Sequence, residues 1–299
     1  MITLLLPSRF NVARTLAFLR SSSLRTPYHF IGPRRLRRLV RLGGRARVVE
    51  FAFSGADTRL RVGIAGEPTV PRPLAQAMRR LGVHVWSLDI DLARCYKIMR
   101  RDPLMAPLLR RCAGLRMIRT PDLYEALLIA VLGQQISVAS AESIRRRLMA
   151  SLGDRAVKDG IVYLGYPPPQ RLRDTAPRLL RALGLSRQKV RYVLEVAERA
   201  AGGALSSEAF DGLTDEQAIE RLTQIPGVGR WTAEIVAMRG LGRADVFPAG
   251  DLGLMVAVHR ALGCAERPEE ADLRTLAERW KGWRSYGALY LWRSLGITA

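Results

Sequence analysis

Two glycines with one residue between them, Gly227 and Gly229, separate two helical patterns and constrain this chain more than any other feature. Upstream, a Thr-x-x-Gln capping box begins a predicted helix over 214–222. Downstream, the apolar run 236–238 predicts a second helix that Gly240 can end. Glycine adopts unusual backbone angles without strain, so the two helices can be joined by a very tight turn. We therefore expect a helix-hairpin-helix unit.

Such a hairpin is suited to binding an anion. Glycines let backbone N–H groups approach a ligand with no side chain between them, and the second helix points its positive end the same way. The expected anion is a phosphate of nucleic acid. The alternative is that a lone Gly-x-Gly turn only connects two helices. The residues expected at this contact are Ile225, Gly227, Gly229, Arg230 and Thr232.

The charge of the chain favours the same partner. It has 48 Lys and Arg against 27 Asp and Glu, a formal net charge of +21, and a field of that sign attracts polyanions. Only four of the basic residues are lysines, and the arginine fork matches phosphate geometry. The alternative is a solvated, arginine-rich surface that reflects only the composition of the genome.

The first 88 residues favour a strand-rich module. The first acidic residue is Glu50, so the leading segment is uniformly basic and resembles a transit peptide in composition. However, segments 48–53 and 60–64 are alternating or apolar and predict strands, and 14–20 predicts a short helix. The basic segment is therefore expected to be part of a folded domain.

From residue 89 onward nearly every periodic segment predicts a helix. Thr120-Pro121 predicts a helix start, because proline is favoured at the first helical position. Segment 163–170 holds three consecutive prolines and predicts a loop within the helical part. The fold class expected is α+β, with a β-rich domain at 1–88 and an all-α domain at 89–299. Further helices are expected at 141–152, 187–200 (capped by Ser186), 269–280 and 286–295.

Neither a signal peptide nor a membrane-spanning run is visible, so we expect a cytoplasmic, nucleoid-associated protein. The three cysteines and the three histidines are scattered along the chain. They form neither a disulfide framework nor a metal-ligand cluster. We expect no metal and no other cofactor.

The block 222–254 resembles the helix-hairpin-helix DNA glycosylase superfamily, whose signature is this hairpin, a Gly/Pro-rich loop and an aspartate. Segments 131–137 (VLGQQIS) and 277–286 (AERWKGWRSY) extend the similarity to the alkylpurine glycosylases of the DNA-3-methyladenine glycosylase II type. The resemblance implies an antiparallel β domain like the TATA-binding protein, then an all-α body in two lobes with the active-site cleft between them.

By this resemblance, Asp251 occupies the catalytic position. Breaking the bond between base and sugar develops positive charge on the deoxyribose, which a nearby carboxylate stabilises, or the carboxylate activates a water. The alternative role for Asp251 is the N-cap of a helix at 252–262. The two roles are compatible, because the positive end of that helix would stabilise the carboxylate charge.

The residue after Gly229-Arg230 separates two chemistries. Superfamily members that also cut the strand place a Schiff-base lysine there, whereas this chain has Trp231. A tryptophan also attracts a cationic alkylated purine. The resemblance therefore implies a monofunctional enzyme, although each aromatic could instead be core packing. The residues expected in the base pocket are Trp231, Trp292, Phe18, Gln134 and Tyr286.

A flipped base leaves a gap that a wedge side chain fills, and the resemblance assigns that position to Gln135, where some relatives have leucine. The chain departs from the pattern of its relatives at two further places: Met255-Val256 stands where many have a basic pair, and Ile235 where some have an aromatic residue. The expected partner is double-stranded DNA with alkylated bases, bound by a monomer. The alternatives are a glycosylase for oxidised or deaminated bases and a non-catalytic DNA-binding module.

Overall fold

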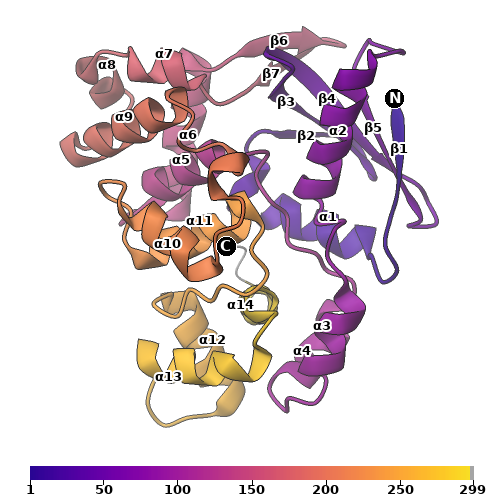
Figure 1. Cartoon of the computed structure of the whole chain (residues 1–299), viewed down its shortest axis with the longest axis vertical. Coiled ribbons are helices and arrows are strands. Elements are labelled where there is room, and N and C mark those ends of the chain that lie inside the picture. Colours follow the sequence, from indigo (N-terminus) through magenta and orange to yellow (C-terminus); the bar gives the residue numbers. More distant parts are fainter. Residues whose placement is uncertain (297–299) are drawn as a thin grey trace.

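The computed structural model describes residues 1–296 and consists of an antiparallel sheet beside a larger helical body (Figure 1). The expected α+β class is confirmed. All neighbouring strands in the five-stranded sheet are antiparallel, in the order β1-β5-β4-β3-β2. The specific likeness to the TATA-binding protein stays a prediction. The strands are β1 (Ile2–Leu5), β2 (Tyr28–Gly32), β3 (Arg35–Leu42), β4 (Arg45–Phe53) and β5 (Arg59–Ile64).

Two helices, α1 (Val12–Ser21) and α2 (Arg72–Val85), accompany the sheet, and α2 packs on β1, β3 and β5. In β5, buried Leu60 and Val62 alternate with exposed Arg59 and Arg61, as the period-2 pattern requires, whereas the last six residues of β4 are all buried. Trp86 closes this core, with its ring centroid 4.9 Å from that of Phe53. The strands predicted at 48–53 and 60–64 and the helix at 14–20 are confirmed.

Six arginines between residues 34 and 47 form ion pairs within the protein. Arg38 of β3 is buried and donates to Glu125 of helix α5 (Leu123–Gly133) at 2.5 Å. Arg37 donates to Asp159 at 2.6 Å. A buried guanidinium needs such a partner because its desolvation is otherwise uncompensated. The basic segment therefore joins the sheet to the helical body.

A small hairpin within the helical part was not predicted. It consists of β6 (Arg155–Lys158) and β7 (Ile161–Leu164), and it packs on β3 and β4. The loop predicted over 163–170 is thus partly wrong. Tyr163 belongs to β7 and is fully buried in a cluster with Leu39 and Val48, so long-range packing decided the conformation.

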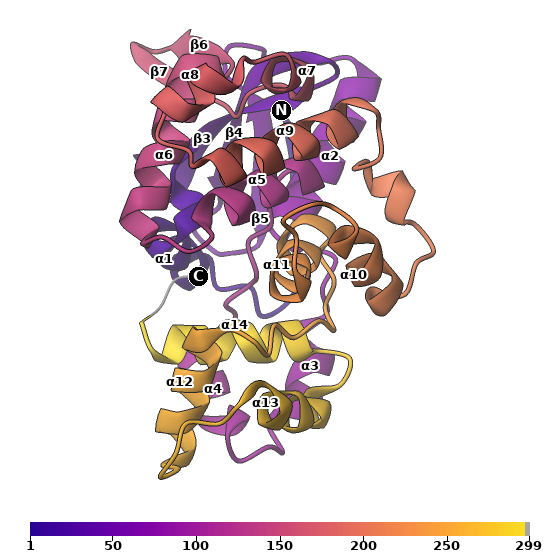
Figure 2. The ribbon, with the colours of Figure 1, turned by 90° about the vertical axis from the view of Figure 1, so that its left-hand side faces the viewer.

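The remaining helices form two groups (Figure 2). The lower group in that view holds α3, α4, α12, α13 and α14, so early and late parts of the sequence pack together there. The upper group runs from α5 to α11. Their bounds are α3 (Leu92–Met99), α4 (Met105–Cys112), α5 (Leu123–Gly133), α6 (Val138–Leu152), α7 (Pro169–Arg173), α8 (Pro177–Ala182), α9 (Arg187–Ala201), α10 (Asp215–Thr223), α11 (Arg230–Val236), α12 (Leu252–Leu262), α13 (Glu270–Ala277) and α14 (Arg284–Ser294).

The observed ends of the helices can be compared with the ends that the sequence predicted. The capping box of Thr214 and Gln217 and the Ser186 cap are both present, so these predictions are confirmed. The helix start at Thr120-Pro121 is wrong, because Asp122 caps α5 instead. Gly240 does not end the second hairpin helix, which continues as a π-helical turn to Leu241 and stops at Gly242 (φ 75°). No helix in the described part of the chain is long and apolar enough to cross a membrane.

Candidate active site

Asp251 begins helix α12 and is held by backbone on both sides. Its N–H donates to the Pro248 carbonyl oxygen at 2.9 Å, and its Oδ1 accepts from the Leu254 N–H at 2.9 Å. The side chain therefore is the N-cap of α12, the alternative role raised by the sequence. This cap fixes the carboxylate at the positive end of the helix.

Two tryptophans from other helices donate to the same carboxylate. The indole Nε1 of Trp231, on α11, lies 3.1 Å from Oδ2 of Asp251. The indole Nε1 of Trp292, on α14, lies 2.8 Å from Oδ1. Trp292 is buried, whereas Trp231 keeps 38% of its surface exposed. Both oxygens are thus oriented by donors, and the exposed part of Trp231 remains available to a planar ligand.

Asp251, Trp231 and Trp292 line one cavity of about 350 Å³. This volume lies at the lower end of the range for small-molecule sites, about 300 to 1,000 Å³. Helices α5 and α6 supply an apolar wall, and Ile235 stands on the α11 side. The arrangement suits one flat, aromatic group placed against a carboxylate. The apolar wall consists of Ala126, Ile129, Ala130, Ile136, Val138 and Ala141.

Two buried arginines also line this cavity, and the sequence analysis missed both. Arg145 of α6 is 2% exposed and Arg239 is 5% exposed. Burial lowers the pKa of Arg239 to about 10, opposed by the nearby Asp251 carboxylate. Arginine is so frequent in this chain that the sequence gives no reason to assign a particular arginine to the site. Only burial at the cavity distinguishes Arg145 and Arg239 from the other arginines.

Three residues expected in the base pocket lie elsewhere. Phe18, on α1, is fully buried in the main hydrophobic core. Tyr286 is 2% exposed, and its ring packs on Trp283 and Tyr290. Gln134 donates its amide to the Gly227 carbonyl oxygen at 2.8 Å and to Thr232 Oγ1 at 3.1 Å. None of the three lines the cavity, because each side chain is engaged in packing or in hydrogen bonds away from it.

The hairpin is built as the glycine spacing predicted. Gly227 has φ 86°, and a Cβ there would lie 2.2 Å from the ring of Tyr192. The Val228 N–H donates to the Ile225 carbonyl oxygen at 2.9 Å, and both side chains are buried. Gly229 caps α11, is exposed, and has open space where a Cβ would be. Backbone at this corner is therefore accessible to a ligand.

Two side chains expected to bind phosphate also have contacts within the protein. Thr232 is buried and accepts the hydrogen bond from Gln134. Arg230 donates to Glu216 at 2.7 Å and to the buried Glu234 at 3.1 Å. Glu234 also accepts from Arg274 of α13 at 3.0 Å. Arg230 thus ties the hairpin to both of its neighbouring helices.

The wedge candidate Gln135 lies in the turn between α5 and α6, is exposed, and has φ 57°. The apolar Ile136 and Val138 beside it are 38% and 63% exposed and border the cavity mouth. Buried Lys189 donates to the Leu132 carbonyl oxygen at 2.7 Å and so fixes the end of α5. The turn is therefore rigidly anchored at its start.

The comparisons with known proteins show the family of this chain. Residues 128–283 match the family model described as the HhH-GPD superfamily base excision DNA repair protein. The chain is 35% identical to the DNA-3-methyladenine glycosylase of Bacillus subtilis over 71% of each protein. It is 36% identical to DNA-3-methyladenine glycosylase 2 of Escherichia coli over 61% of each. The chain belongs to the DNA-3-methyladenine glycosylases of the HhH-GPD superfamily.

The fold comparison extends over nearly the whole of this glycosylase. A solved 3-methyladenine DNA glycosylase from Archaeoglobus fulgidus superposes with a TM-score of 0.84 and 28% identity, covering 97% of each chain. The family model begins in α5 and ends at Trp283, just before α14. It therefore includes Trp231 and Asp251 but not Trp292, which tertiary packing brings to the site.

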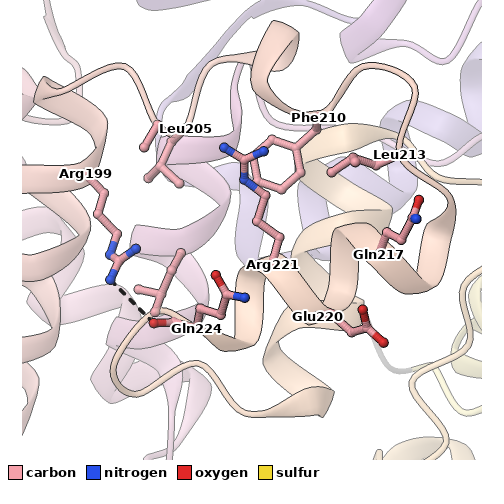
Figure 3. A pocket seen from close by; sticks show the side chains of 10 residues that line it. Arg199, Leu205, Phe210, Leu213, Gln217, Glu220, Arg221 and Gln224 are labelled. Carbon is pink, nitrogen blue, oxygen red and sulfur yellow. Dashed lines mark hydrogen bonds between the residues drawn. The ribbon is translucent and has the colours of Figure 1, made fainter.

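A second hollow of this glycosylase, about 460 Å³, lies between α9 and α10 (Figure 3). Its arginines already have protein partners. Arg199 donates to Glu195 at 2.7 Å and to the Gln224 carbonyl oxygen at 3.4 Å. Arg221 donates to the Ala209 carbonyl oxygen at 2.7 Å. Glu220 is the carboxylate in its lining, but no tryptophan of the described residues lines this hollow, so the smaller cavity is the candidate active site.

Proposed function

We propose that this protein excises alkylated purines from double-stranded DNA by hydrolysing the N-glycosidic bond, with Asp251 as the catalytic carboxylate. The observation that carries the proposal is the pair of indole donors that hold the Asp251 carboxylate at the wall of an aromatic-lined cavity. The alkylated purines named for the relatives, such as 3-methyladenine, are small planar bases of the kind this cavity would accept.

The chemistry follows from the geometry. As the bond between base and C1′ lengthens, positive charge grows on the sugar, and the fixed carboxylate stabilises it. Water then forms the new bond to C1′, and the bonding electrons leave with the base. Trp231 occupies the position where a strand-cutting relative has a Schiff-base lysine. The product is therefore an abasic site with an intact strand.

The protein would hold DNA largely through its own backbone N–H groups. The exposed corner at Gly229 and the start of α11 present N–H groups to a phosphate, while Gln135 would enter the gap left by the flipped base. Such contacts carry no sequence information, so recognition depends on the lesion. Action as a monomer, nucleoid association and the domain division at residue 88 remain predictions.

The test is release of free base from methylated duplex DNA by wild type and by Asp251→Asn. Asparagine is as good an N-cap as aspartate, so α12 should stay capped while the charge is lost. We expect release to fall at least about a hundredfold, DNA binding to persist, and nicks to form only after alkali. Asp174→Asn, at an exposed carboxylate, is the matched control.

Two results would overturn the proposal. Full release by Asp251→Asn would remove the assigned mechanism. DNA binding without release of any base by the wild type would favour a non-catalytic helix-hairpin-helix clamp.

A further inference from the structure

Arg145 presents a buried positive charge to the cavity that would receive the base. It is 2% exposed and lines the cavity from α6, together with Trp231 and Asp251. Its Nη2 donates to the Ser23 carbonyl oxygen at 3.2 Å, Nε is buried with no acceptor, and Nη1 makes no hydrogen bond within the described residues. The guanidinium is therefore incompletely satisfied at a site built to hold a ligand.

No carboxylate of the described residues forms an ion pair with Arg145. The acidic group that acts on it electrostatically is Glu125, which is already committed to Arg38 at 2.5 Å. A buried cation without a paired anion is costly unless something else supplies acceptors. An occupant of the cavity can do so, because a ring carbonyl oxygen or ring nitrogen accepts hydrogen bonds from a guanidinium.

The same charge opposes some occupants. A base alkylated at a ring nitrogen, such as 3-methyladenine, is cationic, and a second cation in a low-dielectric cavity repels it. A neutral base with a carbonyl oxygen, such as hypoxanthine, is not repelled and offers an acceptor. Arg145 therefore acts against cation recognition by the two tryptophans.

We propose that Arg145 is a specificity-determining residue that donates to an acceptor atom of the flipped base, shifting the preference of this enzyme toward neutral bases that carry a ring carbonyl oxygen. The inference rests on the proposed function. Hypoxanthine is the predicted probe. An unsubstituted purine base, neutral but without the oxygen, is its matched comparison.

The test measures single-turnover release of hypoxanthine, unsubstituted purine and 3-methyladenine from otherwise identical duplexes. Arg145→Met removes charge and donors, whereas Arg145→Gln keeps donors without charge. We expect Arg145→Met to lower the ratio of hypoxanthine to purine release about tenfold, the worth of one good hydrogen bond. Release of 3-methyladenine relative to purine should rise in both variants. Arg146→Met, on the exposed neighbour, is the control.

Unchanged ratios in Arg145→Met would overturn the inference. Should that variant fail to fold, Arg145→Gln still tests it, because a ratio of 3-methyladenine to purine release equal to wild type excludes the charge effect. Failure of the proposed function is a different result: wild type would then release none of the three bases.

Discussion

Trp292 donates its indole N–H to Oδ1 of Asp251 at 2.8 Å, although 41 residues separate them in the chain. Trp231 provides the second indole donor, to Oδ2 at 3.1 Å. The carboxylate is thus fixed by three helices at once. The orientation of the carboxylate therefore depends on the packing of the lower helix group against the upper one.

Replacing Trp292 with phenylalanine should slow base release with little loss of folding. An aromatic ring is kept in the core, but the donor to Oδ1 is lost. A hydrogen bond to a charged group contributes about 1.5 to 3 kcal/mol, so we expect a decrease of roughly tenfold to a hundredfold in the single-turnover rate. Trp231→Phe is the parallel variant, and we expect a smaller decrease in its rate because the hydrogen bond that it removes is longer. A Trp292→Phe rate equal to wild type would show that orientation of Asp251 does not limit the reaction.

Replacing Arg230 with methionine should reduce stability and leave the salt dependence of DNA binding unchanged. Its partners are Glu216 and buried Glu234, so its loss should cost about 1 to 2 kcal/mol of unfolding free energy. Denaturant melts and binding over a range of salt concentrations measure the two quantities. Had Arg230 contacted phosphate, the slope of log K against log salt would fall by about 0.9, which would contradict this assignment.

The two hairpin glycines should respond differently to alanine. At Gly227 the backbone has φ 86° and the new Cβ would overlap the Tyr192 ring, so Gly227→Ala should destabilise the protein by about 3 kcal/mol. Gly229 has φ −77° and open space around it, so Gly229→Ala should fold within about 1 kcal/mol of wild type. Its methyl group should nevertheless hinder the phosphate. Thermal melts and DNA affinity separate these effects, and unimpaired affinity in Gly229→Ala would place the phosphate elsewhere.

The protein should lose stability below neutral pH partly through His84. Burial, with the nearby Arg119 charge, lowers its pKa from 6.5 to about 4. The unfolded chain therefore binds a proton at higher pH than the folded one does, so stability is full above pH 6.5 and falls toward pH 4. Between about pH 7 and 5.5 the loss should be about 1 kcal/mol. His84→Gln should show a flatter profile in pH-dependent denaturant melts, and an unchanged slope would count against this role.

Much of the fold was predictable because it depends on local signals. The capping box at Thr214, the cap at Ser186 and the apolar run of β4 are features of neighbouring residues, and all were found. The β6–β7 hairpin was missed because Tyr163 is extended only through its packing on the sheet. The end of the second hairpin helix was misplaced because a π-helical turn carries it past Gly240.

The site shows the same division. The sequence by itself determined the tight glycine turn and the capping aspartate, since each rests on residue type and short spacing, and the family resemblance marked Trp231 as standing in place of a lysine. Only the tertiary structure decided that Trp292 joins Asp251, that Phe18 and Gln134 lie outside the cavity, and that Arg145 lines it. These outcomes depend on which helix faces pack together. The type of a residue does not show which other residue it will contact when it is buried.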